Sequence, residues 1–120
     1  AGALGFCLGG TLAFQVAVHA DPVTAVCYYG AGIFDALGDA PKITCPLLMH
    51  WGGADQYIPR EQIDAVAAMA AGHDTIECHV HEDAGHAFDN SFSPQFHDPP
   101  AAASAWELTS AFLARTLPVS

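Results

Sequence analysis

The sequence contains very little positive charge. Lys and Arg together number 3, against 13 Asp and Glu, and the formal net charge at pH 7 is −10. The three cations, Lys42, Arg60 and Arg115, are scattered along the chain and form no basic patch. Because proteins hold phosphate backbones and anionic headgroups with clustered Lys and Arg, this composition argues against nucleic acid and against a membrane surface as partners.

Long hydrophobic runs and closely spaced cysteines are also missing. No apolar segment approaches the roughly 20 residues that a membrane-spanning helix needs. No C-x-x-C motif occurs, and the four cysteines lie far apart, at Cys7, Cys27, Cys45 and Cys78. This pattern predicts reduced thiols rather than a disulfide framework, and we therefore expect a cytoplasmic protein.

The 120 residues alternate between strand-like and helix-like segments, and 52% of them are hydrophobic. Short apolar segments rich in β-branched and aromatic residues predict strands at 1–5, 23–29, 46–51 and 75–81. Apolar residues at helical spacing predict helices at 9–19, 60–71 and 100–117. Polar loops are expected at 35–43 and 82–99. Strands separated by helices predict an α/β fold, with a mainly parallel sheet flanked by helices.

The last predicted helix is expected to bury one apolar face. The residues assigned to that face are Ala103, Trp106, Leu108, Phe112 and Leu113. Such a stripe at helical spacing is typical of a core-facing helix rather than of a ligand pocket.

The chain begins AGALGFCLGG, which contains the pattern G-x-C-x-G. This is the pattern of a nucleophile elbow, a tight strand-to-helix turn that exposes its central residue, here Cys7. Gly5 and Gly9 are expected to keep strand and helix from colliding. A helix N-terminus favours the thiolate of Cys7, and the N–H of Leu8 is expected to stabilise an oxyanion.

A nucleophile of this kind needs a base and a group that orients the base. Asp55 follows a predicted strand in HWGGADQYIP, and His86 lies in the loop HEDAGHAFDN. The order nucleophile, acid, histidine is that of the α/β-hydrolases, so we assign Asp55 and His86 to these roles. Asp83 and Asp89 flank His86 and are alternatives to Asp55 as its partner.

The remaining histidines and cysteines favour structural roles. His79 and His81 share one face of a predicted strand and could bind a metal, but no third ligand follows at a spacing typical of zinc. We therefore expect no metal and no organic cofactor. His50 is expected to pack or to form a hydrogen bond, and the other three cysteines to lie in the core.

The segments GFCLGG, AVCYYGAGI, LLMHWGGADQYIP and AGHAFDN together resemble the dienelactone hydrolase family of α/β-hydrolases. The resemblance extends over essentially the whole chain. It implies a Cys-Asp-His triad at Cys7, Asp55 and His86, with hydrolysis of a small-molecule carboxylic ester or lactone. It also makes Tyr28, in the YYG segment, a candidate for the wall of the substrate pocket.

The resemblance further implies that part of the family fold precedes this chain. The α/β-hydrolase plan places about four more strands before the elbow. We therefore expect residues 1–120 to form the C-terminal half of the domain, beginning at the elbow. The absent strands would carry a second oxyanion donor, an acidic residue that gates the thiol and a substrate-binding arginine. A second family arginine follows the catalytic histidine, where this chain has Asp89 and Asn90, which argues against dienelactone itself as the substrate.

Two other functions are consistent with the sequence. The chain could be a non-catalytic partial domain that binds a partner, because an elbow strand without its neighbour leaves an open apolar edge. A thiol peroxidase or redox role for Cys7 is chemically possible, but no resolving cysteine lies nearby in the sequence.

Overall fold

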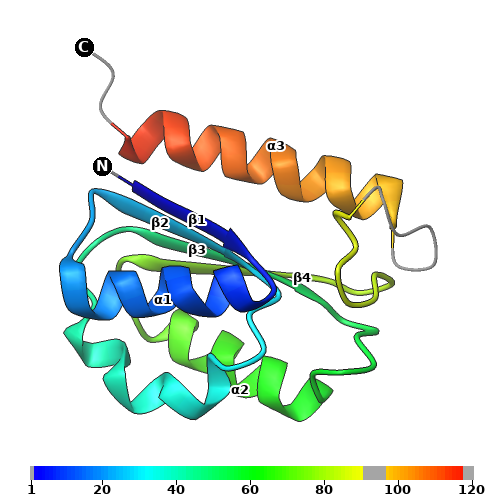
Figure 1. The fold of residues 1–120 in the computed structure, drawn as a ribbon, viewed down its shortest axis with the longest axis horizontal. Helices are drawn as coiled ribbons and strands as arrows, with labels where there is room; N and C mark the ends of the chain where they lie inside the picture. Colours follow the sequence, from blue (N-terminus) through cyan, green and yellow to red (C-terminus); the bar gives the residue numbers. More distant parts are fainter. Residues whose placement is uncertain (1, 91–96, 118–120) are drawn as a thin grey trace.

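Four parallel strands form the centre of the structure, a computed structural model that describes residues 2–90 and 97–117 (Figure 1). They are β1 (Gly2–Phe6), β2 (Thr24–Tyr28), β3 (Leu47–Gly52) and β4 (Ile76–His81). The strands lie in the sheet in the order β1-β2-β3-β4, and each neighbouring pair is parallel. All carboxyl ends therefore meet at one edge of the sheet, which is where open α/β sheets carry their ligand sites.

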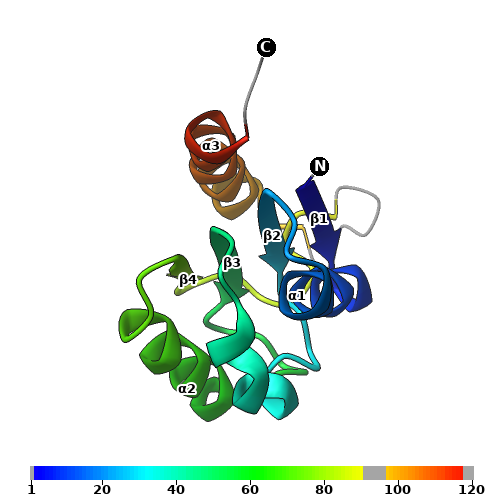
Figure 2. The same cartoon turned by 90° about the vertical axis from the view of Figure 1, so that its left-hand side faces the viewer.

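Helices cover both faces of this sheet. α1 (Leu8–Ala20), α2 (Arg60–Ala71) and the 3-10 helix η1 (Phe34–Lys42) lie on one face. α3 (Pro99–Thr116) lies alone on the opposite face, as the end-on view in Figure 2 shows. The result is the three-layer arrangement predicted from the alternation of strands and helices. Within the described residues, no helix has the length and apolar character needed to cross a membrane.

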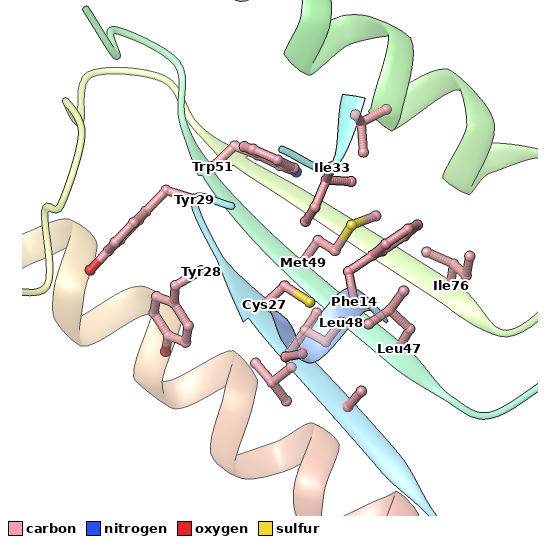
Figure 3. Close-up of a cluster of buried hydrophobic side chains, with 14 of the residues drawn as sticks. Phe14, Cys27, Tyr28, Tyr29, Ile33, Leu47, Leu48, Met49, Trp51 and Ile76 are labelled. Atoms are coloured by element: carbon pink, nitrogen blue, oxygen red, sulfur yellow. The ribbon is translucent and has the colours of Figure 1, made fainter. Parts of the chain in front are cut away.

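The core lies on both sides of β2 and β3, which are buried at every position. Strands covered on both faces read as continuous apolar runs, which explains the segments TAVCY and LLMHW. Figure 3 shows the cluster that these strands form with Phe14 of α1 and with Ile33. The positions of the strands and α-helices agree with the prediction to within about two residues.

Residues 35–43, predicted to be a polar loop, instead form most of η1. The sequence did not predict this helix because it contains Gly38 and Pro41, which are both unfavourable in an α-helix. A 3-10 helix tolerates them over a few turns, and it buries Ala40 between the flanking core residues Ile33 and Ile43.

The predicted apolar face of α3 is also wrong in part. The helix buries Ala105, Thr109 and Phe112, whereas Trp106 is 54% exposed. A hydrogen-bond network explains this rotation: the Thr109 hydroxyl lies 2.9 Å from the hydroxyl of Tyr28 and 2.9 Å from Nε2 of His50. The large Trp106 ring is left on the outer face.

β1 lies at one edge of the described sheet, and its outer surface is apolar. Leu4 is 47% exposed and Phe6 is 38% exposed. Beside them, α1 carries three exposed apolar side chains at four-residue intervals, which we call the α1 stripe: Leu8, Leu12 and Val16. Residues four apart share one face of a helix, so the stripe is continuous.

Candidate active site

Cys7 lies in the one-residue junction between β1 and α1. Its backbone has φ 54° and ψ −120°, a strained conformation for a residue with a side chain. The Cys7 N–H donates a hydrogen bond to the carbonyl oxygen of Tyr28, at 3.0 Å, which holds the turn against β2. These features match the predicted nucleophile elbow.

The predicted requirement for glycine beside Cys7 is confirmed at Gly5 but not at Gly9. A Cβ atom at Gly5 would collide with the backbone of Gly9, and one at Gly10 would collide with the carbonyl oxygen of Tyr28. A Cβ atom at Gly9 would meet nothing within 4 Å. The close approach therefore requires glycine at Gly5 and Gly10, and the requirement predicted for Gly9 is wrong.

The side chains of Cys7, His86 and Asp55 lie in a line. Sγ of Cys7 is 3.7 Å from Nε2 of His86, and Nδ1 of His86 is 2.7 Å from Oδ2 of Asp55. The Asp55 carboxylate can only accept, so Nδ1 carries the hydrogen and Nε2 is left as an acceptor facing the thiol. Neither Asp83 nor Asp89 takes this place beside Nδ1.

Backbone hydrogen bonds hold Asp55 in position. Its Oδ1 accepts from the N–H of Tyr57 at 2.7 Å and from the N–H of Ile58 at 2.9 Å. The turn that carries Asp55 is joined to the loop of His86, because the Ala54 N–H donates to the carbonyl of Ala84 at 2.9 Å. The two loops that follow β3 and β4 are thus fixed relative to each other.

Aromatic rings pack on the His86 imidazole. The ring centroids of Tyr29 and Tyr57 each lie 5.3 Å from that of His86. The Asp55 side chain has no solvent exposure, and that of His86 is 18% exposed. The hydrogen bond between Asp55 and His86 is therefore largely shielded from water.

The electrostatics of Cys7 differ from the prediction. Burial raises the pKa of the Cys7 thiol above its ordinary value, and the negative charge of Asp55 raises that pKa further. Both effects act in the opposite direction to the helix N-terminus, which was expected to favour the thiolate. They favour the protonated thiol, from which a neighbouring base would take the proton.

Two cavities adjoin the candidate active site, one at Cys7 and one at His86. The cavity beside the thiol, which we call the thiol cavity, has a volume of about 210 Å³ and is lined by Phe6, Cys7, Tyr29, Ala87, Asp89 and Asn90. A larger cavity of about 460 Å³ lies against His86 and includes Tyr57, Asp83, His97 and Asp98. Small molecules therefore have space beside the thiol of Cys7 in one cavity and beside the imidazole of His86 in the other.

Tyr28, predicted to line the substrate pocket, does not line either cavity. It is fully buried, and its ring points toward α3, where the hydroxyl reaches Thr109 (Figure 3). The next residue, Tyr29, lines the thiol cavity instead. β2 ends at Tyr28 and Tyr29 has a φ of 40°, so the backbone turns between the two tyrosines and their rings lie in different places.

Leu8 is the first residue of α1, and its side chain is 72% exposed. The N–H groups of the first helical turn have no carbonyl partner within the helix. The N–H of Leu8 belongs to this turn and directly follows Cys7, as the predicted oxyanion role requires.

Three of the other histidines, His50, His79 and His81, form a cluster. Nδ1 of His50 lies 3.1 Å from Nε2 of His81, and the ring of His79 stacks on that of His50. Burial lowers the pKa of His50 to about 3, helped by His81 and His79, so His50 is neutral. In the part of the chain that the structure describes, no three or more His, Cys, Asp or Glu side chains gather in a way that could hold a metal.

Comparison with known proteins agrees with this geometry. The model of the dienelactone hydrolase family matches residues 1–117. The chain is 36% identical over 101 residues to carboxymethylenebutenolidase of Pseudomonas putida, covering 84% of this chain and 43% of that protein. It is 33% identical over 93 residues to carboxymethylenebutenolidase 1 of Cupriavidus pinatubonensis, covering 78% and 39%.

A solved structure shows the same fold. The crystal structure of a dienelactone hydrolase-like promiscuous phosphotriesterase from metagenomic libraries superposes with a TM-score of 0.78 at 22% identity, over 96% of this chain and 52% of that one. The chain thus spans about half the length of the relatives it matches. With a family match that runs over nearly all its residues, it belongs to the dienelactone hydrolase family and has an α/β-hydrolase fold.

Proposed function

We propose that the protein is a hydrolase that cleaves a carboxylic ester or lactone of a small molecule, with Cys7 as the nucleophile. The observation that carries the proposal is the hydrogen-bonded line from Asp55 through His86 to the thiol of Cys7 at a strained turn. Membership of the dienelactone hydrolase family supports it. The activity is proposed for the whole protein, because this chain spans about half the length of the relatives it matches.

In the first step, His86 acts as a general base. The raised pKa of Cys7 favours the protonated thiol, so Nε2 of His86 accepts its proton as Sγ attacks the substrate carbonyl. A carbon–sulfur bond forms and the carbonyl electron pair moves to oxygen. Asp55 stabilises the resulting imidazolium through Nδ1, which explains why its carboxylate is held by two backbone N–H groups.

The tetrahedral intermediate then collapses to a thioester. The N–H of Leu8 is the donor that this chain offers to the oxyanion. The imidazolium returns its proton to the departing alkoxide, after which His86 activates a water that hydrolyses the thioester. A thiolate is a good leaving group, so this scheme suits activated esters and lactones better than amides. Every step uses protein groups and water.

We also propose that these residues belong to a larger domain in which more protein lies along β1. The exposed side chains of β1 and the α1 stripe support this, because parallel sheets are normally covered at both faces. The additional strands could precede this chain or belong to another polypeptide. All four cysteines are free, which supports a reducing compartment such as the cytoplasm.

The decisive experiment replaces the nucleophile in the protein expressed from its complete reading frame. Cys7→Ala is expected to lower kcat/KM for an activated aryl ester by roughly 10³-fold or more. Cys78→Ala, which removes a partly buried thiol from β4, is the matched control and should retain activity. An acylated Cys7 peptide, found by mass spectrometry after rapid quenching, would identify the thioester. Unchanged turnover in Cys7→Ala would exclude this mechanism.

The same experiment separates the alternatives. The open surface of β1 favours a non-catalytic domain that binds a partner chain, and this function predicts no ester turnover in any variant. A thiol peroxidase has less support, because peroxide reacts with thiolates and the pKa of Cys7 is raised.

A further inference from the structure

Asp89 lines the thiol cavity together with Cys7 and Asn90. Phe6, Tyr29 and Ala87 complete the lining and offer aromatic and methyl surfaces. Asp89 is only partly exposed, and burial raises the pKa of its carboxyl group, whereas His97 lowers it. The negative charge also acts on its neighbours, because it contributes to the raised pKa of Tyr29.

No Lys or Arg of this chain neutralises Asp89. The chain has only three such residues, and each forms an ion pair with another carboxylate. The pairs are Lys42 with Asp39 at 3.2 Å, Arg60 with Asp64 at 2.8 Å and with Glu82 at 2.6 Å, and Arg115 with Glu77 at 2.9 Å. Lys and Arg of this chain therefore neutralise neither Asp89, whose charge acts on Tyr29, nor Asp55, whose charge acts on Cys7.

We propose that Asp89 determines substrate specificity: it makes the thiol cavity accept neutral or cationic esters and reject substrates that carry a carboxylate near the scissile bond. This inference rests on the proposed function, since it concerns the group that Cys7 attacks. The physical cause is repulsion between two carboxylates in a partly buried space, where water screens charge poorly. Specificity of this kind comes from an unfavourable contact with the wrong substrate rather than from an additional contact with the right one.

The first test measures charge selection at Cys7 without any hydrolysis. Iodoacetamide and iodoacetate alkylate the same sulfur, but only iodoacetate is anionic. Their rates at Cys7 are measured by peptide mass spectrometry in the protein from its complete reading frame, and are compared with the rates at free mercaptoethanol. We expect the preference for iodoacetamide to exceed that of the free thiol by roughly tenfold.

The variants assign this preference to Asp89. Asp89→Asn has nearly the same shape and should remove most of the additional preference, whereas Asp89→Glu should retain it. Asp74→Asn is the matched control, because it removes an exposed carboxylate beyond the opposite, amino end of β4. An equal preference in the wild type and Asp89→Asn would overturn the proposal. The iodoacetamide rate in each variant verifies that Cys7 is still accessible.

Three p-nitrophenyl esters extend the test to turnover. The butyrate, the hemisuccinate and the 4-trimethylammoniobutanoate share a leaving group and differ in the charge of the acyl chain. We expect kcat/KM for the hemisuccinate to be the lowest, and Asp89→Asn to raise it relative to the butyrate by roughly tenfold. If no ester is hydrolysed, the proposed function fails while the alkylation ratio still decides the role of Asp89. If esters are hydrolysed in an unchanged ratio, only the inference about Asp89 fails.

Discussion

At the scale of single residues, the hydrogen bonds around Asp55 decide which nitrogen of His86 can act as a base. Oδ1 is occupied by two backbone N–H groups, so Oδ2 is aimed at Nδ1 of His86. This leaves Nε2 without a hydrogen and pointing at the thiol. The same carboxylate raises the pKa of Cys7. Asp55 therefore makes the base effective and the resting thiol less acidic at the same time.

Asp55→Asn is predicted to separate these two effects. An amide can donate to Nδ1 and leave the hydrogen on Nε2, so kcat/KM should fall by roughly 10³- to 10⁴-fold, as in comparable triads. Loss of the negative charge removes one cause of the raised pKa of Cys7, so the pH profile of Cys7 alkylation by iodoacetamide should move to lower pH. A profile that stays in place, or moves to higher pH, would contradict the assigned electrostatic role.

The sequence could predict the reactive residues of this site but not the residues that line its cavity. Cys7, Asp55 and His86 carry recognisable chemistry in motifs of fixed order, and the structure brings all three together. Phe6, Tyr29 and Asp89 were not predicted as cavity residues, because lining a cavity depends on where a side chain points at the end of a strand. In the YYG segment both tyrosines have equal chemistry, and only the turn of the backbone after the end of β2 distinguishes them.

At the scale of elements, the contact between β1 and α1 is the feature that constrains the sequence most. The helix begins one residue after Cys7, and its first turn lies directly against the backbone of β1 and β2. Gly9 and Gly10 are adjacent helical residues in very different surroundings, because one faces open space and the other faces the carbonyl of Tyr28. Substitutions at these two glycines can therefore be compared directly.

We predict opposite effects of alanine at these two glycines. Gly9→Ala should raise the free energy of unfolding by about 0.5–1 kcal/mol, because alanine is the better helix former and its methyl group has room. Gly10→Ala should lower it by about 2 kcal/mol or more, because its Cβ requires α1 to move away from β2. Urea unfolding of both variants provides the measurement. Equal effects would mean that the elbow is not held by this close approach.

The elements that sequence patterns predicted less well are those whose position depends on tertiary contacts. η1 contains Gly38 and Pro41, and it is stabilised by burying Ala40 rather than by helix propensity. α3 was predicted over the right residues but with a face that is only partly right, because Thr109 forms buried hydrogen bonds with Tyr28 and His50. Hydrophobic periodicity cannot predict that a polar residue lies at the centre of a buried helix face.

At the scale of the whole molecule, the sheet is covered unevenly. β2 and β3 are buried at every position, while β1 has a paired edge toward β2 and an exposed apolar surface beside the α1 stripe. Exposed apolar patches of this kind mark surfaces that contact other protein. Cys7 follows the last residue of this strand, so protein that covers β1 also borders the thiol cavity, to which Phe6 contributes.

The α1 stripe provides the test of this arrangement, in the protein expressed from its complete reading frame. Leu12→Glu is predicted to lower the free energy of unfolding by about 2 kcal/mol or more, because a covered Glu would lose its hydration without gaining a partner. Trp106→Glu, on the outer face of α3, changes a side chain of similar exposure (54% against 57%) and should have an effect within about 0.5 kcal/mol. Urea unfolding compares the two. If Leu12→Glu is as mild as Trp106→Glu, the stripe faces water and the additional strands proposed along β1 do not cover it. A large difference would mean that the turn at Cys7 is completed and stabilised by protein packed against β1 and α1.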